Sequence, residues 1–181
     1  MNYYRYNNYG YGINNQEFPY VPVLDMSATQ QQIQSVGMFT YPQNLQNALD
    51  LIQQALIGEN EDRMFYSWLI ENAPSDKEKE IISGIREAEI GHFELFNQIY
   101  NEVSGMMPQQ APGEQFTPPE NYCVGLENAI LKEENAVQKY REILYAMQNR
   151  VHINMMTEII TDAIRHGMLY NYLYAKNSCK G

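Results

Sequence analysis

The chain has 181 residues, of which 44% are hydrophobic, and its 22 acidic against 12 basic residues give a formal charge of −10. This length suits one domain with an appended tail, and the hydrophobic content is enough for a packed core. The acidic balance excludes a basic nucleic-acid-binding surface, and no apolar run approaches the ~20 residues that a membrane span needs.

The first 20 residues are rich in Tyr, Asn and Gly and show neither a helical nor a strand period. We expect this stretch to be a tail, disordered or docked as an extended arm, that mediates self-association or incorporation into an assembly. Tyrosine suits that role because it provides large contact area at little cost in rotamer entropy. The predicted division is a tail and transition segment over 1–40, a folded domain over 41–177 and a C-terminal tail over 178–181.

Apolar residues at helical spacing, separated by helix-ending residues, predict four long helices. Pro42 suits a first helical turn, the pair Ala73-Pro74 ends that helix, and a capping box from Ser75 to Glu78 opens the next. A Pro/Gly/Gln-rich connection, 105–120, separates the second helix from the third. The short, long and short connections predict an all-α four-helix bundle with one crossover between helices two and three. The predicted helices run over about 43–72, 75–104, 122–147 and 150–176.

Several charged residues lie on the apolar seams of these helices. Glu133 stands between two apolar seam residues of the third helix, where burial of an unpaired carboxylate costs several kcal/mol. Glu59 holds an equivalent position on the first helix. The second helix carries Glu89 and His92 as a Glu-x-x-His motif, and this spacing lets both side chains reach one ion from one face.

Three pairs of residues lie 74 positions apart, so the chain consists of two helical hairpins in register. If the second hairpin runs inverted against the first, a pseudo-twofold axis brings the mid-helix groups to the centre of the bundle. The negative charge of three carboxylates does not fully neutralise the positive charge of two divalent ions. The remaining positive charge leaves room for a bridging oxo or hydroxo group, so the pattern predicts a two-metal site. The pairs are Glu59 and Glu133, Tyr66 and Tyr140, and His92 and His166.

A Glu on the first and third helices, with Glu-x-x-His on the second and a matching His on the fourth, resembles the ferritin-like di-metal carboxylate proteins. The segment Gly58 to Tyr66 (GENEDRMFY) is more narrowly similar to the first-helix signature of the rubrerythrins. The resemblance covers about 43–176 and implies a ferritin-like bundle that binds two divalent ions, iron or manganese. According to this resemblance, the metal ligands are Glu59, Glu89, His92, Glu133 and His166.

The sequence departs from the rubrerythrin pattern. Ala163 stands where the family has a Glu three residues before the last His, and Asp162, on a neighbouring face, is a further candidate ligand. Ala136 stands where rubrerythrins place an extra Glu, and the sequence has no C-terminal rubredoxin domain. The remaining three Glu and two His are similar to the ligand set of manganese catalases. Tyr66 and Tyr140 are predicted core aromatics that could also donate hydrogen bonds to the ligands.

The remaining His and Cys residues are not predicted to bind metal. His152 begins the fourth helix and is predicted to lie on the surface. Cys123 and Cys179 form no CxxC motif or zinc knuckle, and a single disulfide between them stays open. Without a disulfide framework or a secretory signal, we expect a cytoplasmic location, with the spore coat as the alternative.

Two classes of function follow. The first is an oxidoreductase, rubrerythrin-like or manganese-catalase-like, in which two ions reduce peroxide or dioxygen while the protein supplies ligands and a dry cavity. The second is a structural protein that uses the bundle as a scaffold, because the Tyr/Asn/Gly head resembles the tyrosine-rich ends of spore-coat and other assembly proteins. Iron storage is a third interpretation. We expect a small-molecule oxidant as partner, self-association through the tail, and neither nucleic acid nor membrane.

Overall fold

The computed structural model describes residues 44–109 and 116–179, apart from the side chains of Glu59 and Asn60. The predicted N-terminal tail lies outside the described residues. Within them the chain is all α-helical, as predicted, and has no strand. None of the helices in this part of the chain is long and apolar enough to cross a membrane. The helices are α2 (Leu45–Ile57), α3 (Glu59–Asn72), α4 (Asp76–Ser104), α5 (Tyr122–Tyr145) and α6 (Arg150–Lys176).

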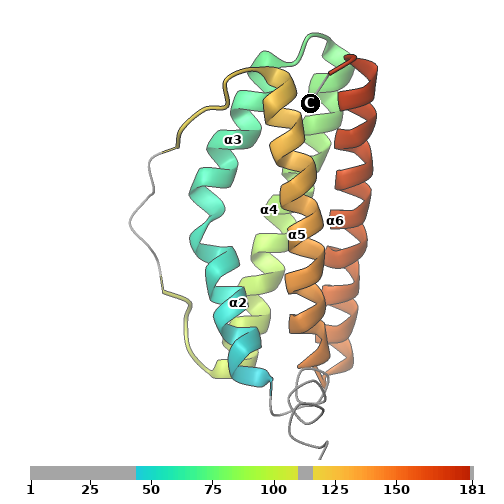
Figure 1. Cartoon of the computed structure of the whole chain (residues 1–181). Helices are drawn as coiled ribbons and strands as arrows, with labels where there is room; N and C mark the ends of the chain where they lie inside the picture. The colour runs from blue at the N-terminus through green and yellow to red at the C-terminus, as the bar shows by residue number, and fades with distance from the viewer. Residues whose placement is uncertain (1–43, 110–115, 180–181) are drawn as a thin grey trace, which may run out of the picture.

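The first predicted helix is divided at Gly58 into α2 and α3, which corrects the expectation of one continuous helix. Glycine weakens a helix interior by about 1 kcal/mol relative to alanine, because it has the most backbone freedom to lose. Backbone hydrogen bonds still bridge the division: the Gly58 N–H donates to the Gln54 carbonyl (3.3 Å), and the Asp62 N–H donates to the Gly58 carbonyl (3.1 Å). Figure 1 shows α3 continuing in the direction of α2, so the two form one column of the bundle.

Four helical columns form the bundle: α2 with α3, then α4, α5 and α6 (Figure 1). The α2–α3 column packs against α4 and α5, and α6 packs against the same two helices. The α2–α3 column and α6 are therefore diagonal partners. The α3–α4 turn lies at one end of the bundle and the α5–α6 turn at the other (Figure 1), so the second hairpin runs inverted against the first. This is the relation that the 74-residue register predicts.

Capping residues fix the helix ends close to the predicted positions. The Ser75 hydroxyl accepts a hydrogen bond from the Glu78 N–H, which confirms the predicted capping box at the start of α4. Gly105 ends α4 with a φ of 70°, a left-handed conformation that glycine adopts without strain. The side chains of Asn121 and Asn149 cap α5 and α6 in the same way as Ser75 caps α4.

The hydrophobic core forms two clusters along the bundle axis, and buried polar side chains on α4, α5 and α6 lie between them. The cluster nearer the α5–α6 turn contains Ala48, Ile52, Leu56, Phe96, Ile99, Ile143, Ala146, Met147, Met156 and Ile159. The cluster nearer the α3–α4 turn contains Tyr66, Leu69, Ala73, Ile82, Ile85, Leu126, Ala129, Tyr170 and Leu173. Because polar groups are costly to bury unless they have partners, the layer between the clusters calls for a chemical explanation.

The buried carboxylate of Glu78 and a disulfide connect the helices at the end of the bundle where the α3–α4 turn lies. Glu78 is 2% exposed, and its carboxylate accepts hydrogen bonds from the Tyr122 hydroxyl (3.0 Å) and the Lys176 ammonium (2.9 Å). These bonds join the start of α4 to the start of α5 and the end of α6. Cys123 and Cys179 form a disulfide beside them, so the pairing that the sequence left open is present.

His152 is buried, so its predicted surface position is wrong. It is 5% exposed, and its Nε2 lies 2.7 Å from Oε2 of Glu102. The reason is its place on α6, where His152, Met156 and Ile159 follow each other at spacings of four and three and share the buried face. This histidine belongs to the end of the bundle near the α5–α6 turn, 14 residues or about 21 Å along α6 from His166.

Candidate metal centre

The polar layer between the two hydrophobic clusters comes from three helices. Glu89 and His92 lie on one face of α4, because residues three apart in a helix are neighbours. Glu133 comes from the middle of α5, and Asp162 and His166, four apart, come from one face of α6. All five carry nitrogen or oxygen atoms that bind divalent metal ions in proteins.

Glu89, Glu133 and His166 form the centre of this layer. One ligand atom from each lies within 4.8 Å of the other two. Nδ1 of His166 is 2.8 Å from Oε1 of Glu89 and 3.8 Å from Oε1 of Glu133. Metal–ligand bonds of about 2.0–2.2 Å to nitrogen and oxygen place ligands of one ion up to about 4 Å apart. The three residues therefore form a group that could hold a metal ion.

His92 extends the cluster on the other side of Glu89. Its Nδ1 is 3.4 Å from Oε2 of Glu89, so the two oxygens of that carboxylate face two different histidines. The rings of His92 and His166 lie 5.9 Å apart between centroids. Nε2 of His92 is 3.3 Å from Oδ2 of Asp162, whose other oxygen is 3.3 Å from Nε of Arg165. Asp162 thus contacts the outer nitrogen of His92.

The electrostatics of the cluster differ between its two central carboxyl groups, and Glu133 is the one that is costly to ionise without a cation. Burial and the charge of Glu89 raise the pKa of Glu133 to about 9, so Glu133 carries a proton at neutral pH. For Glu89 burial opposes ionisation, but hydrogen bonds from His166 and His92 outweigh it and lower the pKa to about 2. Burial also acts against protonation of His92, but Glu89 and Asp162 outweigh it and raise its pKa. Protons on this cluster occupy the electrostatic role that a bound cation would take.

Two buried polar atoms at the cluster have no hydrogen-bond partner among the described residues: Nε2 of His166 and the hydroxyl of Tyr170. His166 and Tyr170 are both 0% exposed. Buried polar atoms are satisfied in the great majority of cases, so two exceptions one helical turn apart on α6 fit a site that holds a ligand. Burial and the charges of Glu133 and Glu89 raise the pKa of Tyr170, which keeps it a neutral phenol.

The two predicted tyrosines lie in different clusters. Tyr66 is buried in the cluster near the α3–α4 turn, and burial together with the charge of Glu89 raises its pKa. Tyr140 is half-buried and packs on Phe96 in the other cluster, with ring centroids 5.1 Å apart. The sequence interpretation missed Tyr170, although it lies 74 positions after Phe96 and one helical turn after His166.

The structure therefore brings Glu89, His92, Glu133 and His166 together as the sequence predicted. Asp162 contacts His92 and is not one of the three residues that converge on a common point. The side chain of Glu59, the remaining predicted ligand, lies outside the described residues. Its backbone begins α3 directly after Gly58.

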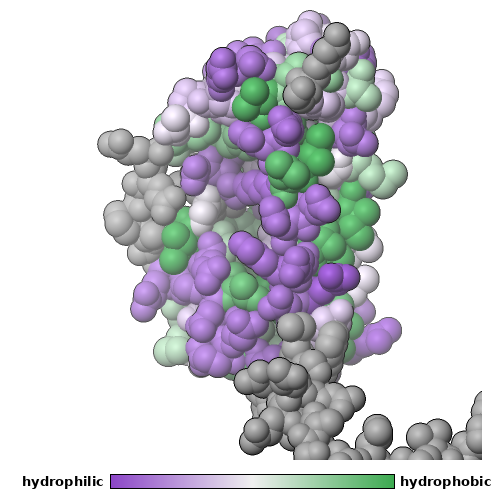
Figure 2. Space-filling view, in the orientation of Figure 1, coloured by the Kyte–Doolittle hydropathy of each residue, from purple (hydrophilic) through white to green (hydrophobic). Residues whose placement is uncertain are grey.

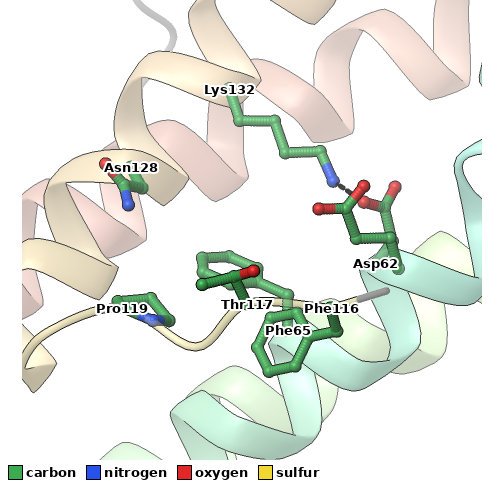
Figure 3. Close-up of a pocket in the computed structure, with 8 residues that line it drawn as sticks. Asp62, Phe65, Phe116, Thr117, Pro119, Asn128 and Lys132 are labelled. Atoms are coloured by element: carbon green, nitrogen blue, oxygen red, sulfur yellow. Dashed lines mark hydrogen bonds and ion pairs between the residues drawn. The ribbon is translucent and has the colours of Figure 1, made fainter. Parts of the chain in front are cut away.

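An ion pair between Lys132 of α5 and Asp62 of α3 lies beside the site and was not predicted. Figure 3 shows the Lys132 side chain reaching across to Asp62 above Phe65. Lys132 Nζ is also 5.6 Å from the centroid of the Tyr66 ring. The pair is near enough to Glu133 to act on its pKa, which Lys132 lowers and Asp62 raises.

Comparison with known proteins gives one informative match. The chain is similar to the uncharacterized protein YhjR of Bacillus subtilis (strain 168), with 28% identity over 123 residues. The match covers 67% of this chain and 82% of YhjR. No protein-family model matches the chain. No solved structure matches it significantly.

Proposed function

We propose that this chain is a ferritin-like protein that binds two divalent ions, iron or manganese, at the polar layer and reduces peroxide or dioxygen there. The observation that carries the proposal is the buried convergence of Glu89, Glu133 and His166 between two hydrophobic clusters. The inverted second hairpin supports a ferritin-like bundle, because the junction of α2 with α3 and the middles of α4, α5 and α6 lie at a similar level (Figure 1).

The residues present fit a metal centre. Glu89 directs one oxygen to His166 and the other to His92, so it would help to hold both ions. Glu133 and His166 would hold one ion, and His92 would hold the other together with Glu59 as the sequence register predicts. The protonated Glu133 fits as well, because a metal ion can replace that proton.

Asp162 has a positioning role in this proposal. Metal-binding histidines usually donate their second ring N–H to a carboxylate, which fixes the tautomer and the ring orientation. Asp162 accepts from Nε2 of His92 and leaves Nδ1 directed at Glu89. Arg165 holds Asp162 in turn, at 3.3 Å.

When bound, the two ions would supply the redox chemistry, since no side chain of the cluster changes oxidation state readily. The protein contributes binding, orientation and exclusion of water. The two hydrophobic clusters keep water from the site along the bundle axis. Tyr66 and Tyr170 stay neutral and can donate hydrogen bonds towards charge at the centre.

A structural role is the second candidate. Ala163, which is 2% exposed, supplies no ligand from α6 where the rubrerythrin pattern has a Glu. A bundle with an incomplete site and a Tyr-rich head could serve as a scaffold in an assembly such as a spore coat. In that case the buried carboxylates would be retained without bound metal.

Metal content separates the two candidates. The full chain is produced with iron and manganese available, purified without chelators, and analysed for metal per chain. Near two ions per chain supports the proposed function, and near zero leaves the scaffold. Glu133→Gln should abolish binding, whereas the matched change at its exposed neighbour, Glu134→Gln, should leave the metal content unchanged.

A further inference from the structure

We propose that a groove between α5 and α6 is the entrance through which a small uncharged molecule reaches the metal centre. The proposal rests on the proposed function, because it assigns a route to the same site. The groove has a volume of about 450 Å³. Its lining includes Ile130, Val137, Ala163, Ile164, Gly167 and Met168, with Glu133 among them.

The inner part of the groove lies against the candidate metal centre. Glu133 lines the groove although it is only 6% exposed, so the groove reaches a residue of the buried cluster. A Cβ atom built on Gly167 would lie 3.5 Å from Cβ of Glu133, so the α6 backbone approaches the base of the Glu133 side chain closely. Ala163 lines the same groove, and a glutamate at that position would fill space that the alanine leaves. The small side chain of Ala163 is therefore consistent with a route along this groove.

The chemistry of the groove selects uncharged molecules. Its walls are mainly apolar, and an ion entering them would lose hydration without compensation. The carboxylate of Glu134 adds a penalty for anions. The mouth carries exposed apolar side chains, Ile164 at 49% and Met168 at 69%. Figure 2 shows hydrophobic side chains gathered over the middle of α6. Hydrogen peroxide and dioxygen, both small and uncharged, fit these limits.

A second cavity lies near the site and carries more charged side chains than the groove. Between α5 and the α2–α3 column lies a cavity of about 350 Å³ that Asp62, Lys132 and Lys139 line. The ion pair between Lys132 and Asp62 spans α5 and α3 there (Figure 3). A neutral molecule gains nothing from these charges, and the residues that line this cavity include none of Glu89, Glu133 and His166. The α5–α6 groove is therefore the better entrance for an uncharged oxidant.

The test blocks each approach with the same residue. Ile164→Trp fills the mouth of the α5–α6 groove, and Lys139→Trp fills the charged cavity as the matched control. Met168→Trp is a second block of the groove in case Ile164→Trp disturbs folding, which thermal unfolding reports. All variants are full-length and are compared with the wild-type chain.

The first readout needs no metal. Xenon dissolved in the buffer should shift the methyl resonance of Ala163 in the wild-type chain and in Lys139→Trp, because xenon enters apolar cavities. The shift should be lost in Ile164→Trp and Met168→Trp. Absence of the Ala163 shift in the wild-type chain would overturn the proposal.

The second readout uses the chain loaded with ferrous iron under anaerobic conditions, after its iron content has been measured. The binding rate of nitric oxide, a small uncharged probe, should fall about tenfold in Ile164→Trp and stay unchanged in Lys139→Trp. Equal rates in all variants, or slowing by Lys139→Trp alone, overturn the groove as the entrance and leave the metal centre intact. A chain that takes up neither iron nor manganese instead overturns the proposed function, and the metal analysis identifies that case before any rate is measured.

Discussion

Oε1 of Glu89 and Nδ1 of His166 lie 2.8 Å apart, although 77 positions separate the two residues in the sequence. This contact joins the first helical hairpin to the second at the level between the two hydrophobic clusters. Since the other oxygen of Glu89 faces His92, a single carboxylate organises both histidines of the cluster. Glu89 is therefore the residue on which the geometry of the site depends most.

Replacing Glu89 should affect both metal binding and folding. Glu89→Gln removes the negative charge that both histidines face, so metal content should fall at least about tenfold. The metal-free protein should lose about 1–3 kcal/mol of its free energy of unfolding, because the buried histidines lose a charged partner. Metal analysis and urea unfolding measure the two effects. The control is Glu94→Gln, an exposed change on the same helix, which should alter neither quantity.

The pKa of Glu133 predicts how the metal-free protein responds to pH. Because burial and Glu89 raise this pKa to about 9 in the folded chain, while the unfolded chain keeps the ordinary value of 4.5, folding takes up a proton between these values. The free energy of unfolding should therefore fall as pH rises from about 5 to about 9. Glu133→Gln keeps the neutral shape and should lack this part of the dependence.

Urea unfolding of the wild-type chain and of Glu133→Gln, in the presence of a chelator, measures the difference between the two proteins across that pH range. The stability advantage of Glu133→Gln should grow towards high pH. A difference in free energy of unfolding that stays constant with pH would contradict the raised pKa. It would show that Glu133 is ionised in the folded protein and that other interactions offset the cost of burying its charge.

The contact between Asp162 and His92 predicts a loss of metal affinity without loss of fold. Asp162→Asn keeps the size of the side chain but weakens the hold on Nε2 of His92, so metal affinity should fall about 10- to 100-fold. Titration with Mn²⁺ measures this affinity. Glu158→Gln, an exposed change one turn earlier on α6, is the control. An unchanged affinity in Asp162→Asn would mean that packing alone orients the histidine.

Glu78 should contribute strongly to stability and nothing to metal binding. Its burial opposes ionisation, but hydrogen bonds from Lys176, Asn177 and Tyr122 outweigh that effect and lower its pKa. The contribution is therefore present at neutral pH and is lost as the pH falls through the lowered pKa. Glu78→Gln should cost about 2–4 kcal/mol in the free energy of unfolding at pH 7, with metal content retained. Glu80→Gln, exposed on the same helix, should cost less than about 1 kcal/mol.

The Tyr-rich head predicts a separable role in assembly. Deleting residues 1–38 leaves α2 to α6 whole, so the shortened chain should bind the same amount of metal per chain. It should lose self-association or incorporation into its native assembly, which sedimentation and co-purification measure. Loss of metal on truncation would mean that the head closes the site, against the division into bundle and assembly arm.

The sequence predicted the helices well because their signals are local. The capping box at Ser75 and the left-handed Gly105 fixed both ends of α4 within one residue. The 74-residue register also predicted a long-range feature, the meeting of Glu89 with Glu133 and His166, because a repeat carries information about symmetry. The division at Gly58 was missed, since a single glycine inside a strongly periodic segment gives a weak signal.

Features that depend on contacts between residues far apart in the sequence could not be predicted from local sequence signals. The ion pair between Lys132 and Asp62 joins two ordinary charged residues, and nothing in their local sequence identifies the partner. His152 was placed on the surface because it begins a helix, although its spacing of four and three from Met156 and Ile159 marked the buried face. The groove between α5 and α6 depends on how two helices pack around Ala163 and Gly167, which the sequence does not specify.

Anomalous X-ray scattering from crystals of the chain grown with Mn²⁺ would locate metal ions in the polar layer directly. We expect two manganese peaks about 3.5–4 Å apart. Both should be bound by Glu89, one beside Glu133 and His166 and the other beside His92. No peak in the layer between the hydrophobic clusters, or peaks only at surface carboxylates, would contradict the proposed metal centre and leave the bundle as a scaffold.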